Sequence, residues 1–215
     1  LGEEDSMYST LPVNEFLDAL SSKEPVPGGG SAAALGGSLA AALVSMVCHL
    51  TMGKKGYEGV EGAMADLLCE SEALRAELPK LLEADTQVYA RVMSAYRLPR
   101  NTPEERAARQ AAYQAALKEA AEVPLTIAER CARVVELALP AAEMGNTWAV
   151  SDAGVAVLLA HACTRAALLN VTINLSSIKD EAFVADLRAR MLRITAGKDD
   201  LTERVMARVN QAIGA

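Results

Sequence analysis

The amino-acid sequence predicts an all-α protein, a single-domain helical bundle that spans residues 1–215 and contains six or seven helices. Hydrophobic residues make up 51% of the chain, which has one Trp, five Tyr and two Phe beside 41 alanines. Small side chains let helix backbones pack closely, whereas strands favour aromatic and β-branched residues. No segment of the sequence alternates convincingly, and no repeat or low-complexity linker divides it. Two alanine-rich apolar helices are expected at the centre of the bundle.

The first two helices are separated by a strong break. A short amphipathic helix is expected over 12–20, and the Pro-Val-Pro-Gly-Gly-Gly stretch at 25–30 cannot continue a helix stably. Ser31 is a suitable N-cap for the alanine-rich helix that follows, which Gly53 ends.

Two long helical patterns come next. The first covers 60–96, with a kink or break expected at Pro79. The second begins at Thr102, where a cap, a proline and two glutamates mark a helix start. It is expected to be interrupted near Pro124 and to end near Leu139.

The last third of the chain contains the second apolar helix. Ser151 and Asp152 are expected to cap it, and it extends to about Ile178. Two short amphipathic helices follow near 181–195 and 201–213, separated by a glycine.

Charge and cysteine usage limit the classes of function. With 21 Lys+Arg and 28 Asp+Glu the formal net charge is −7, which argues against binding duplex nucleic acid by phosphate neutralisation. Four cysteines without paired spacing are expected to be reduced thiols, neither disulfides nor a zinc site. The acidic start at Glu3, Glu4 and Asp5 is unlike a secretory signal. We therefore expect a cytoplasmic protein.

One segment meets the length criterion for a transmembrane helix. Residues 31–52 carry no formal charge over 22 positions, but they are mainly Ala, Gly and Ser, and they include His49. The comparable stretch 153–175 contains His161, Arg165 and two asparagines. A helix that is apolar all round can equally be the core of a bundle, so no membrane association is expected.

The glycine-rich loop before the first apolar helix is a candidate binding element. Gly28, Gly29, Gly30 and Ser31 lie at a helix start, where free N–H groups and the helix dipole can receive a phosphate or carboxylate. No Lys-Ser/Thr pair follows, so it is not a Walker loop. The alternative is a turn that allows close helix approach.

Asp85 is the most informative carboxylate. At helical spacing its neighbours are leucines, valines and a tyrosine, so the acid lies within an apolar stripe. Burial would raise the pKa of this carboxyl and suit it to acid–base catalysis near neutral pH. The alternatives are a buried hydrogen-bonding partner without a catalytic role, or a carboxylate at a helix break after Pro79.

Other polar residues are candidates for ligand contacts. Asn170 and Asn174 lie on one helix face, where carboxamides can bind a heterocycle or simply link helices. Lys54 and Lys55 can bind carboxylates, as can Arg97 and Arg100, although exposed cations are often only solvated. The further candidates are Tyr57, Asn146, Trp148 and Asp152.

A metal site is not expected. The two histidines of the chain, His49 and His161, lack a Glu-x-x-His partner, and a packed imidazole is the simpler interpretation of each.

These stretches together resemble the formiminotransferase-cyclodeaminase C-terminal family. The matching motifs are PVPGGGS at 25–31, MVCHLTMGKKGY at 46–57, DTQVYARVMSAYRLP at 85–99, GNTWAVSD at 145–152 and NVTIN at 170–174. The resemblance extends over 12–213. It implies a homodimer that binds tetrahydrofolate near the subunit interface, with Asp85 as the catalytic residue.

The resemblance implies two alternative reactions. One is cyclodeamination of 5-formiminotetrahydrofolate to 5,10-methenyltetrahydrofolate and ammonia, and the other is hydrolysis of methenyltetrahydrofolate to 10-formyltetrahydrofolate. We predict the first, although no residue separates the two, and a folate-binding subunit without catalysis is a third alternative. No cofactor is expected beyond tetrahydrofolate as the carrier. The chain is too short to contain the transferase half, so a separate formiminotransferase is an expected partner.

Specific contacts with the folate are also predicted. The glycine loop, Lys54 and Lys55 would hold its glutamate tail, and Asn170 and Asn174 would contact the pterin.

Overall fold

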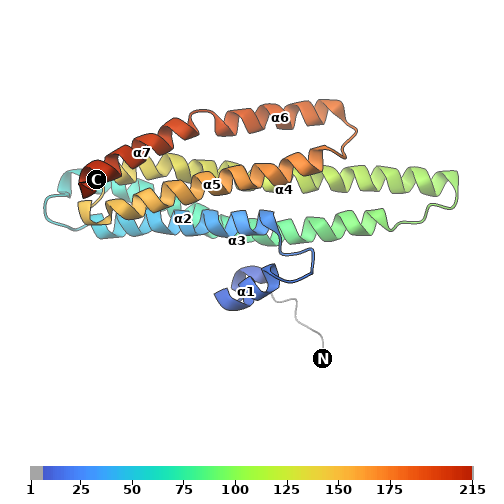
Figure 1. Ribbon diagram of the computed structural model, residues 1–215, viewed down its shortest axis with the longest axis horizontal. Coiled ribbons are helices and arrows are strands. Elements are labelled where there is room, and N and C mark those ends of the chain that lie inside the picture. The colour runs from blue at the N-terminus through green and yellow to red at the C-terminus, as the bar shows by residue number, and fades with distance from the viewer. Residues whose placement is uncertain (1–6, 215) are drawn as a thin grey trace.

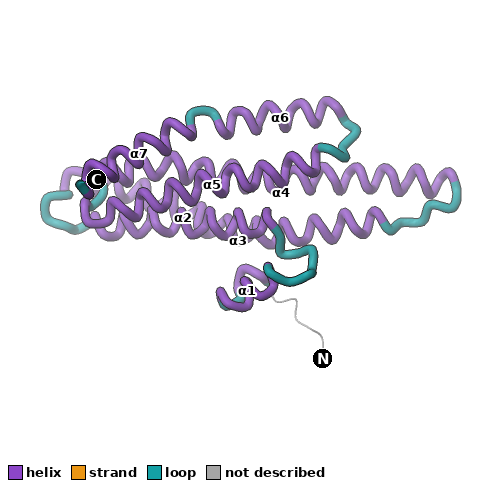
Figure 2. Tube along the Cα trace, in the orientation of Figure 1, coloured by secondary structure: helices purple, strands orange, loops and turns teal. Residues whose placement is uncertain are grey.

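The computed structural model describes residues 7–214, in which all regular secondary structure is helical (Figures 1 and 2). The predicted all-α class is confirmed. The helices are α1 (Val13–Leu20), α2 (Gly29–Thr51), α3 (Glu61–Tyr96), α4 (Pro103–Met144), α5 (Val150–Leu175), α6 (Glu181–Thr195) and α7 (Lys198–Ile213). Three 3₁₀ turns accompany them, η1 (Tyr8–Thr10), η2 (Glu58–Val60) and η3 (Thr147–Ala149). The acidic residues Glu3, Glu4 and Asp5 lie outside the described residues.

Helices α2 to α5 form an elongated bundle along the long axis of the molecule (Figure 1). Helices α6 and α7 follow one side of it, and α1 lies on the opposite side, close to the start of α2. Helices α3 and α4 are the longest, at 36 and 42 residues, and the ends that join them project beyond the other helices.

The bundle contains two apolar cores, one toward each end of α2. One is built around Val44, Met64 and Val157, near the α2–α3 loop. The other surrounds Leu82 and Leu125, at the end where α2 begins. The second core holds the segment of α3 that carries Asp85.

Glycines on α2 allow its neighbours to approach closely. A Cβ atom at Gly36 would lie 2.4 Å from the Cys163 sulfur of α5, and one at Gly37 would lie 2.5 Å from the Cys131 sulfur of α4. Real Cβ atoms do not make contacts this short, so larger side chains here would push the helices apart. The small-residue composition that predicted tight packing therefore has a direct structural role.

Some helix boundaries differ from the predictions. Helix α3 continues through Pro79, and α4 continues through Pro124 and Pro140 to Met144. A proline inside a helix costs about 3 kcal/mol through its lost hydrogen bond and its steric clash. Packing of the long helices against their neighbours offsets that cost, and Pro124 itself is buried. The predicted interruption near Pro124 and the end near Leu139 are wrong.

Two predicted N-caps are also wrong, whereas a third is confirmed. Helix α2 begins at Gly29, so Ser31 lies inside the helix, and Asp152 lies in the first turn of α5 rather than before it. At the start of α4 the Thr102 hydroxyl accepts from the Glu105 N–H in a complete capping box.

Helix α2 and the segment Thr147–Leu175 are long and apolar enough to cross a membrane. In their most apolar stretches 56% and 50% of the residues, respectively, are buried inside the bundle. Core helices of a bundle have the same composition, so the expectation of no membrane association stays a prediction.

Candidate functional site

A cavity of about 420 Å³ lies where the start of α2 meets the end of α5, the last third of α3 and the first half of α4. This volume is within the range typical of small-molecule sites. Its lining includes Gly28, Gly29, Gly30, Asp85, Asn170 and Asn174. The fold therefore brings together three elements that were separate in sequence: the glycine loop, the acidic residue and the asparagine pair.

Asp85 points directly at the start of α2. The Ser31 hydroxyl donates a 2.9 Å hydrogen bond to Asp85 Oδ2. A Cβ atom at Gly30 would lie 2.4 Å from Asp85 Oδ1, so only glycine leaves room for the carboxylate at this position. The glycine loop thus allows α3 to approach the start of α2 closely, which is the alternative that sequence analysis left open.

Burial raises the pKa of the Asp85 carboxyl above its ordinary value. Removal of the charged form from water is the larger effect, and the hydrogen bonds from Ser31 offset only part of it. A carboxyl group with a raised pKa exchanges protons more readily near neutral pH than an exposed one. Asp85 can therefore act as both proton acceptor and proton donor.

The two asparagines use their amide nitrogens to fix their position. Asn170 donates to the Ala166 carbonyl at 3.0 Å, and Asn174 donates to the Ala120 carbonyl of α4 at 2.6 Å. Their side-chain oxygens accept no hydrogen bond from the described residues. The pocket therefore offers hydrogen-bond acceptors to a ligand that is rich in N–H groups.

Apolar and aromatic side chains form the remaining walls. Val88, Val92 and Leu117 line the cavity together with Tyr89 and Tyr113. Flat rings of this kind favour an aromatic ligand. The described lining contains no lysine or arginine, so the cavity itself has no cation for a negatively charged group.

Sequence analysis missed both tyrosines as functional candidates. Tyr89 follows Asp85 by one helical turn and was detectable from that spacing, but only as part of an apolar stripe. Tyr113 is separated from Asp85 by 28 positions and lies in an alanine-rich helix, so no local signal identified it.

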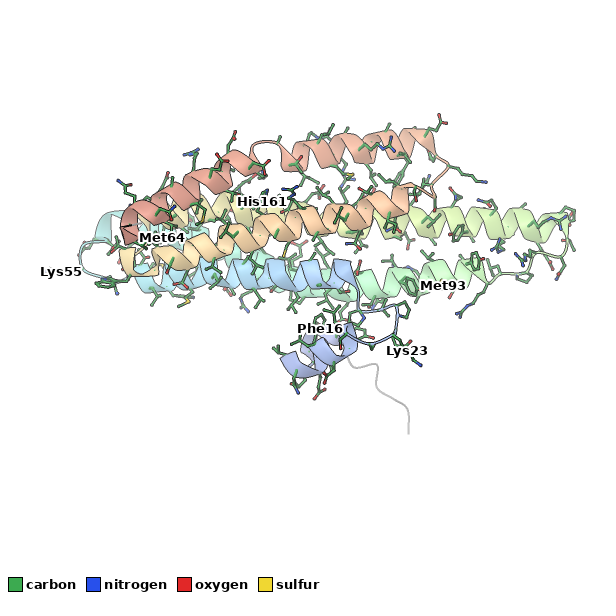
Figure 3. All side chains as sticks on the ribbon, in the orientation of Figure 1. Phe16, Lys23, Lys55, Met64, Met93 and His161 are labelled. Carbon is green, nitrogen blue, oxygen red and sulfur yellow. The ribbon has the colours of Figure 1, made fainter. Side chains whose placement is uncertain are left out.

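Five predicted site residues lie at the opposite end of the bundle. Figure 3 shows Lys55 at that end, far from Phe16 of α1, which lies near the start of α2. Lys54 and Lys55 follow the end of α2, which has 23 residues and is therefore about 35 Å long. Within one chain they do not meet Asp85.

Tyr57, Asn146 and Asp152 lie near these lysines. The Tyr57 hydroxyl accepts from the Thr147 N–H at 3.1 Å, and Asn146 donates to the Leu50 carbonyl at 2.8 Å. These contacts fasten the α4–α5 connection to the end of α2. Trp148, in the same connection, is 90% exposed.

The histidines and cysteines form no metal or nucleophile site in the described part of the chain. His161 contacts Asp199 at 2.9 Å, away from the cavity, and no group of three or more His, Cys, Asp and Glu side chains converges there. Burial raises the pKa of Cys48 and Cys163 to about 11, so their thiols stay protonated and unreactive near neutral pH.

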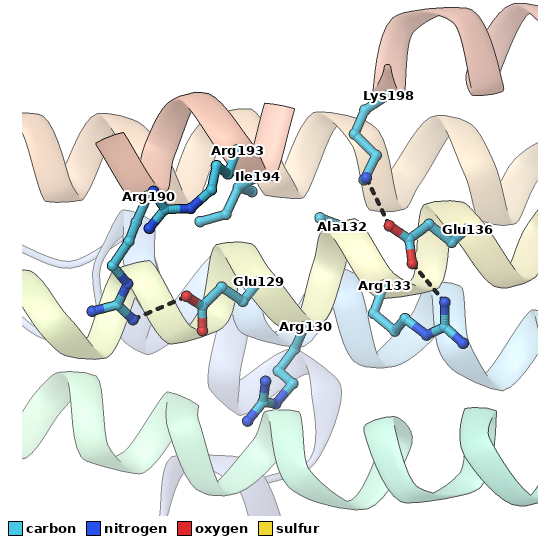
Figure 4. A pocket seen from close by; sticks show the side chains of 9 residues that line it. All are labelled: Glu129, Arg130, Ala132, Arg133, Glu136, Arg190, Arg193, Ile194 and Lys198. Carbon is cyan, nitrogen blue, oxygen red and sulfur yellow. Dashed lines mark hydrogen bonds and ion pairs between the residues drawn. The ribbon is translucent and has the colours of Figure 1, made fainter. Parts of the chain in front are cut away.

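A second cleft, between α4 and helices α6 and α7, is lined mainly by charged residues (Figure 4). Arg133 and Lys198 both contact Glu136, and Arg190 contacts Glu129 at 2.9 Å. Arg133, Lys198 and Arg190 are thus paired with carboxylates, and these contacts hold the helices together. The Asp85 cavity is the better candidate site.

Known proteins resemble this chain over most of its length. The sequence profile of the formiminotransferase-cyclodeaminase family matches residues 12–193. The chain is 45% identical over 207 residues to a protein of Methylorubrum extorquens named methenyltetrahydrofolate cyclohydrolase, covering 96% of this chain and 100% of that protein. It is 35% identical over 193 residues to formimidoyltransferase-cyclodeaminase of Gallus gallus, covering 90% of this chain but 36% of that longer protein.

A solved structure has the same fold. The crystal structure of formiminotetrahydrofolate cyclodeaminase from Thermotoga maritima matches with a TM-score of 0.85 at 32% identity, covering 95% of this chain and 98% of that one.

Fold and cavity together define an all-helical protein that holds a half-buried carboxyl group with a raised pKa in a cavity of about 420 Å³. The profile match and the relatives extend over most of its length, and the chain belongs to the formiminotransferase-cyclodeaminase family. The resemblance found in the sequence is confirmed.

The raised pKa of Asp85 predicts a stability cost at neutral pH. Between the ordinary pKa and the raised one the folded chain binds more protons than the unfolded chain, so the free energy of unfolding falls as pH rises through that window. Asp85→Asn removes the charge, and we expect this variant to be more stable than the parent at pH 7 but not at pH 3.5. Urea unfolding at both pH values measures the difference.

Glu70→Gln is a control for which we expect a change in the free energy of unfolding at pH 7 of the opposite sign. Its hydrogen bond with Arg133 lowers the pKa of Glu70, so this carboxylate stabilises the fold above the ordinary pKa, and the effect is lost on acidification. This variant should be less stable than the parent at pH 7. If Asp85→Asn lowers the free energy of unfolding at pH 7 as much as Glu70→Gln does, the proposed cost of burying the Asp85 charge is contradicted.

Proposed function

We propose that this protein is an enzyme of one-carbon folate metabolism that uses Asp85 for acid–base catalysis. The observation that carries the proposal is the position of Asp85: a half-buried carboxyl with a raised pKa, hydrogen-bonded to Ser31, in a cavity lined with amide acceptors and tyrosines. Family membership and the names of the relatives indicate a folate substrate.

The leading reaction is cyclodeamination of 5-formiminotetrahydrofolate. N10 attacks the carbon of the formimino group, whose nitrogen is protonated, to close the ring, and the Asp85 carboxylate accepts the N10 proton. The resulting carboxylic acid then protonates the amino nitrogen on the same carbon. The C–N bond breaks, ammonia leaves, and 5,10-methenyltetrahydrofolate remains. One proton passes through Asp85, which ends the cycle as a carboxylate.

The second candidate is hydrolysis of 5,10-methenyltetrahydrofolate. The relative with that name is 45% identical and is matched over its full length, which favours this reaction. Water attacks the methenyl carbon, and Asp85 accepts a proton from it. The carbon–N5 bond then breaks as N5 is protonated, which gives 10-formyltetrahydrofolate and releases one proton to solvent. The same residue serves both reactions because both form a tetrahedral centre at the same carbon.

The walls of the pocket suit the pterin end of a folate. Its ring N–H and amino groups are donors that match the free side-chain oxygens of Asn170 and Asn174. Tyr89 and Tyr113 offer flat surfaces to the aromatic part of the substrate. Gly28 and Gly29 also line the cavity.

Both reactions act on a carbon that the folate already carries and require only proton transfers, so we expect no cofactor beyond tetrahydrofolate. A formiminotransferase must supply the substrate of the first reaction. All four cysteines are unpaired thiols, which is typical of proteins in the reducing cytoplasm, where we place this one.

An assay with the purified protein tests the function. With 5-formiminotetrahydrofolate we expect the absorbance of methenyltetrahydrofolate to appear together with ammonia, and the rate to fall about 10²- to 10⁴-fold in Asp85→Asn. Methenyltetrahydrofolate in the same cuvette tests the second reaction, because an active hydrolase removes its absorbance faster than buffer does.

Glu83→Gln is the matched control, because Glu83 is on the same helix but outside the cavity, and this variant should keep the parent rate. If neither substrate reacts faster than in buffer, the catalytic proposal fails. Folate binding without turnover would then indicate a binding subunit.

We also propose that two copies of the chain pair through the outer sides of α2 and α5. These neighbouring helices expose large apolar side chains, namely Leu39 and Met46 on α2 and Val155, Leu158, Leu169 and Ile173 on α5. Exposed apolar side chains on neighbouring helices are typical of subunit interfaces. Because Lys54 and Lys55 do not meet Asp85 within one chain, they can contact its ligand only from a second copy.

Leu39→Glu tests the homodimer. Leu39 is 54% exposed and distant from the cavity, so a charge there should leave the fold intact but prevent association. We expect light scattering to give the dimer mass for the parent and the monomer mass for the variant. Leu192→Glu, a change on α6 at a position that is 72% exposed, should remain dimeric. A monomeric parent would contradict the proposed interface.

A further inference from the structure

Ser31 carries a buried hydroxyl group that neither reaction gives a role. It lies in the first turn of α2 and is 0% exposed. A serine or threonine inside a helix commonly donates to the carbonyl four residues earlier, as Thr51, Thr164 and Thr202 do. The Ser31 hydroxyl instead crosses to α3 and donates to Asp85, 54 positions later in the chain. This hydroxyl is therefore committed to the acid–base residue and not to its own helix.

The contact distinguishes the two oxygens of the Asp85 carboxylate. The Ser31 hydroxyl lies 2.9 Å from Oδ2, whereas Oδ1 accepts no side-chain hydrogen bond from residues 7–214. Gly30 and Asp85 line the cavity, but Ser31 does not. The hydroxyl thus holds one oxygen from outside the cavity, and the other oxygen is left to exchange a proton with a ligand.

Ser31 also opposes the effect of burial on this carboxyl. Burial raises the pKa of Asp85, and the hydrogen bonds of the Ser31 hydroxyl and N–H lower it by a smaller amount. A hydrogen bond to a charged acceptor is stronger than one to a neutral acceptor, so the hydroxyl favours the carboxylate over the acid. Within residues 7–214 no other charged side chain of α2, α3, α4 or α5 lines the cavity, and its other titratable groups are the phenols of Tyr89 and Tyr113. The hydroxyl therefore controls how much of Asp85 is charged at a given pH.

We propose that Ser31 is a positioning residue for Asp85, whose hydroxyl holds Oδ2 so that Oδ1 exchanges the proton with the substrate and the carboxyl stays charged between turnovers. This inference rests on the proposed function, since it concerns the acid–base residue of the same reaction. Oδ1 accepts the proton from N10 or from the attacking water and later gives it to the departing nitrogen. Ser31 keeps its own proton throughout, because Oδ2 can accept its hydrogen bond in both protonation states of Asp85.

The pH dependence of kcat/KM tests this role. Both reactions begin with Asp85 as a carboxylate, so the rate falls on acidification with a midpoint that reports its protonation. Ser31→Ala removes the hydroxyl and keeps the N–H, and we expect it to move the midpoint upward by about one to two pH units. At a pH below both midpoints kcat/KM should therefore be about 10- to 100-fold below that of the parent.

The kinetic constants well above both midpoints separate positioning from substrate binding. Asp85 is then charged in the parent and in the variant, so any remaining loss reports the orientation of the carboxylate. We expect the kcat of Ser31→Ala to stay about tenfold lower. Its KM should change less than twofold, because Ser31 does not line the cavity.

Ser45→Ala is the matched control, because it removes another buried serine hydroxyl from α2, one that contacts the Ser71 hydroxyl at 2.8 Å. It should keep the parent midpoint and kcat. An unchanged midpoint in Ser31→Ala would overturn the inference, and so would an equal shift in Ser45→Ala. If Ser31→Ala does not fold, Ser31→Cys takes its place. A thiol is a weaker donor, so the midpoint should move upward by a smaller amount, and a midpoint equal to that of the parent would overturn the inference.

Failure of the proposed function gives a different result. If the parent turns over neither substrate, carbon-13 NMR still measures the titration midpoint of the Asp85 carboxyl, with its signal identified by its absence from Asp85→Asn. An upward shift in Ser31→Ala but not in Ser45→Ala supports the role of the hydroxyl, whereas equal midpoints in all three proteins overturn it.

Discussion

The contact between the start of α2 and Asp85 is the constraint on which the site depends. Gly30 has no side chain, so the carboxylate of α3 approaches the backbone of α2 and meets the Ser31 hydroxyl. The same approach removes the carboxylate from water and raises its pKa. The position of the Asp85 carboxylate and its raised pKa therefore have the same structural cause. Helix α5 completes the arrangement, because its asparagines line the cavity that the approach creates.

Close packing along α2 extends this constraint through the bundle. Gly36 admits the Cys163 sulfur of α5, and Gly37 admits the Cys131 sulfur of α4 and the Leu78 side chain of α3. Three neighbouring helices are therefore held at short distance from one helix of small residues. Such packing leaves little freedom for α3 to shift relative to α2, which keeps the acid–base group in place. The composition that first indicated a helical bundle thus also explains how a carboxyl group is held at a fixed position. Long helices then separate the two ends of the molecule, so Lys54 and Lys55 do not meet Asp85 within one chain.

Much of the fold was predictable from the sequence, because alanine content, helix caps and glycine-rich breaks act locally. The Thr102 capping box is an example of a local signal that the structure confirms. Pro124 is the opposite case: alone it predicts an interruption, but burial between neighbouring helices outweighs its local cost. No pattern within a single helix reports that kind of packing.

The site was predictable only in part, for a similar reason. Asp85 was identified because an acid within an apolar stripe is a local anomaly. Tyr113 becomes relevant only when α3 and α4 lie side by side, and sequence order does not report that proximity. The sequence motifs suggested a single group of ligand-binding residues, whereas the fold places these residues at two opposite ends of the bundle.

The central claim is that the fold raises the pKa of Asp85 and so prepares it for acid–base catalysis. Carbon-13 NMR of the aspartate carboxyl groups tests this directly, with the Asp85 signal assigned by its absence from the Asp85→Asn variant. The account predicts a titration midpoint clearly above the ordinary aspartate value of about 3.9. A midpoint at or below that value would show that burial does not control this carboxyl, and would contradict the account.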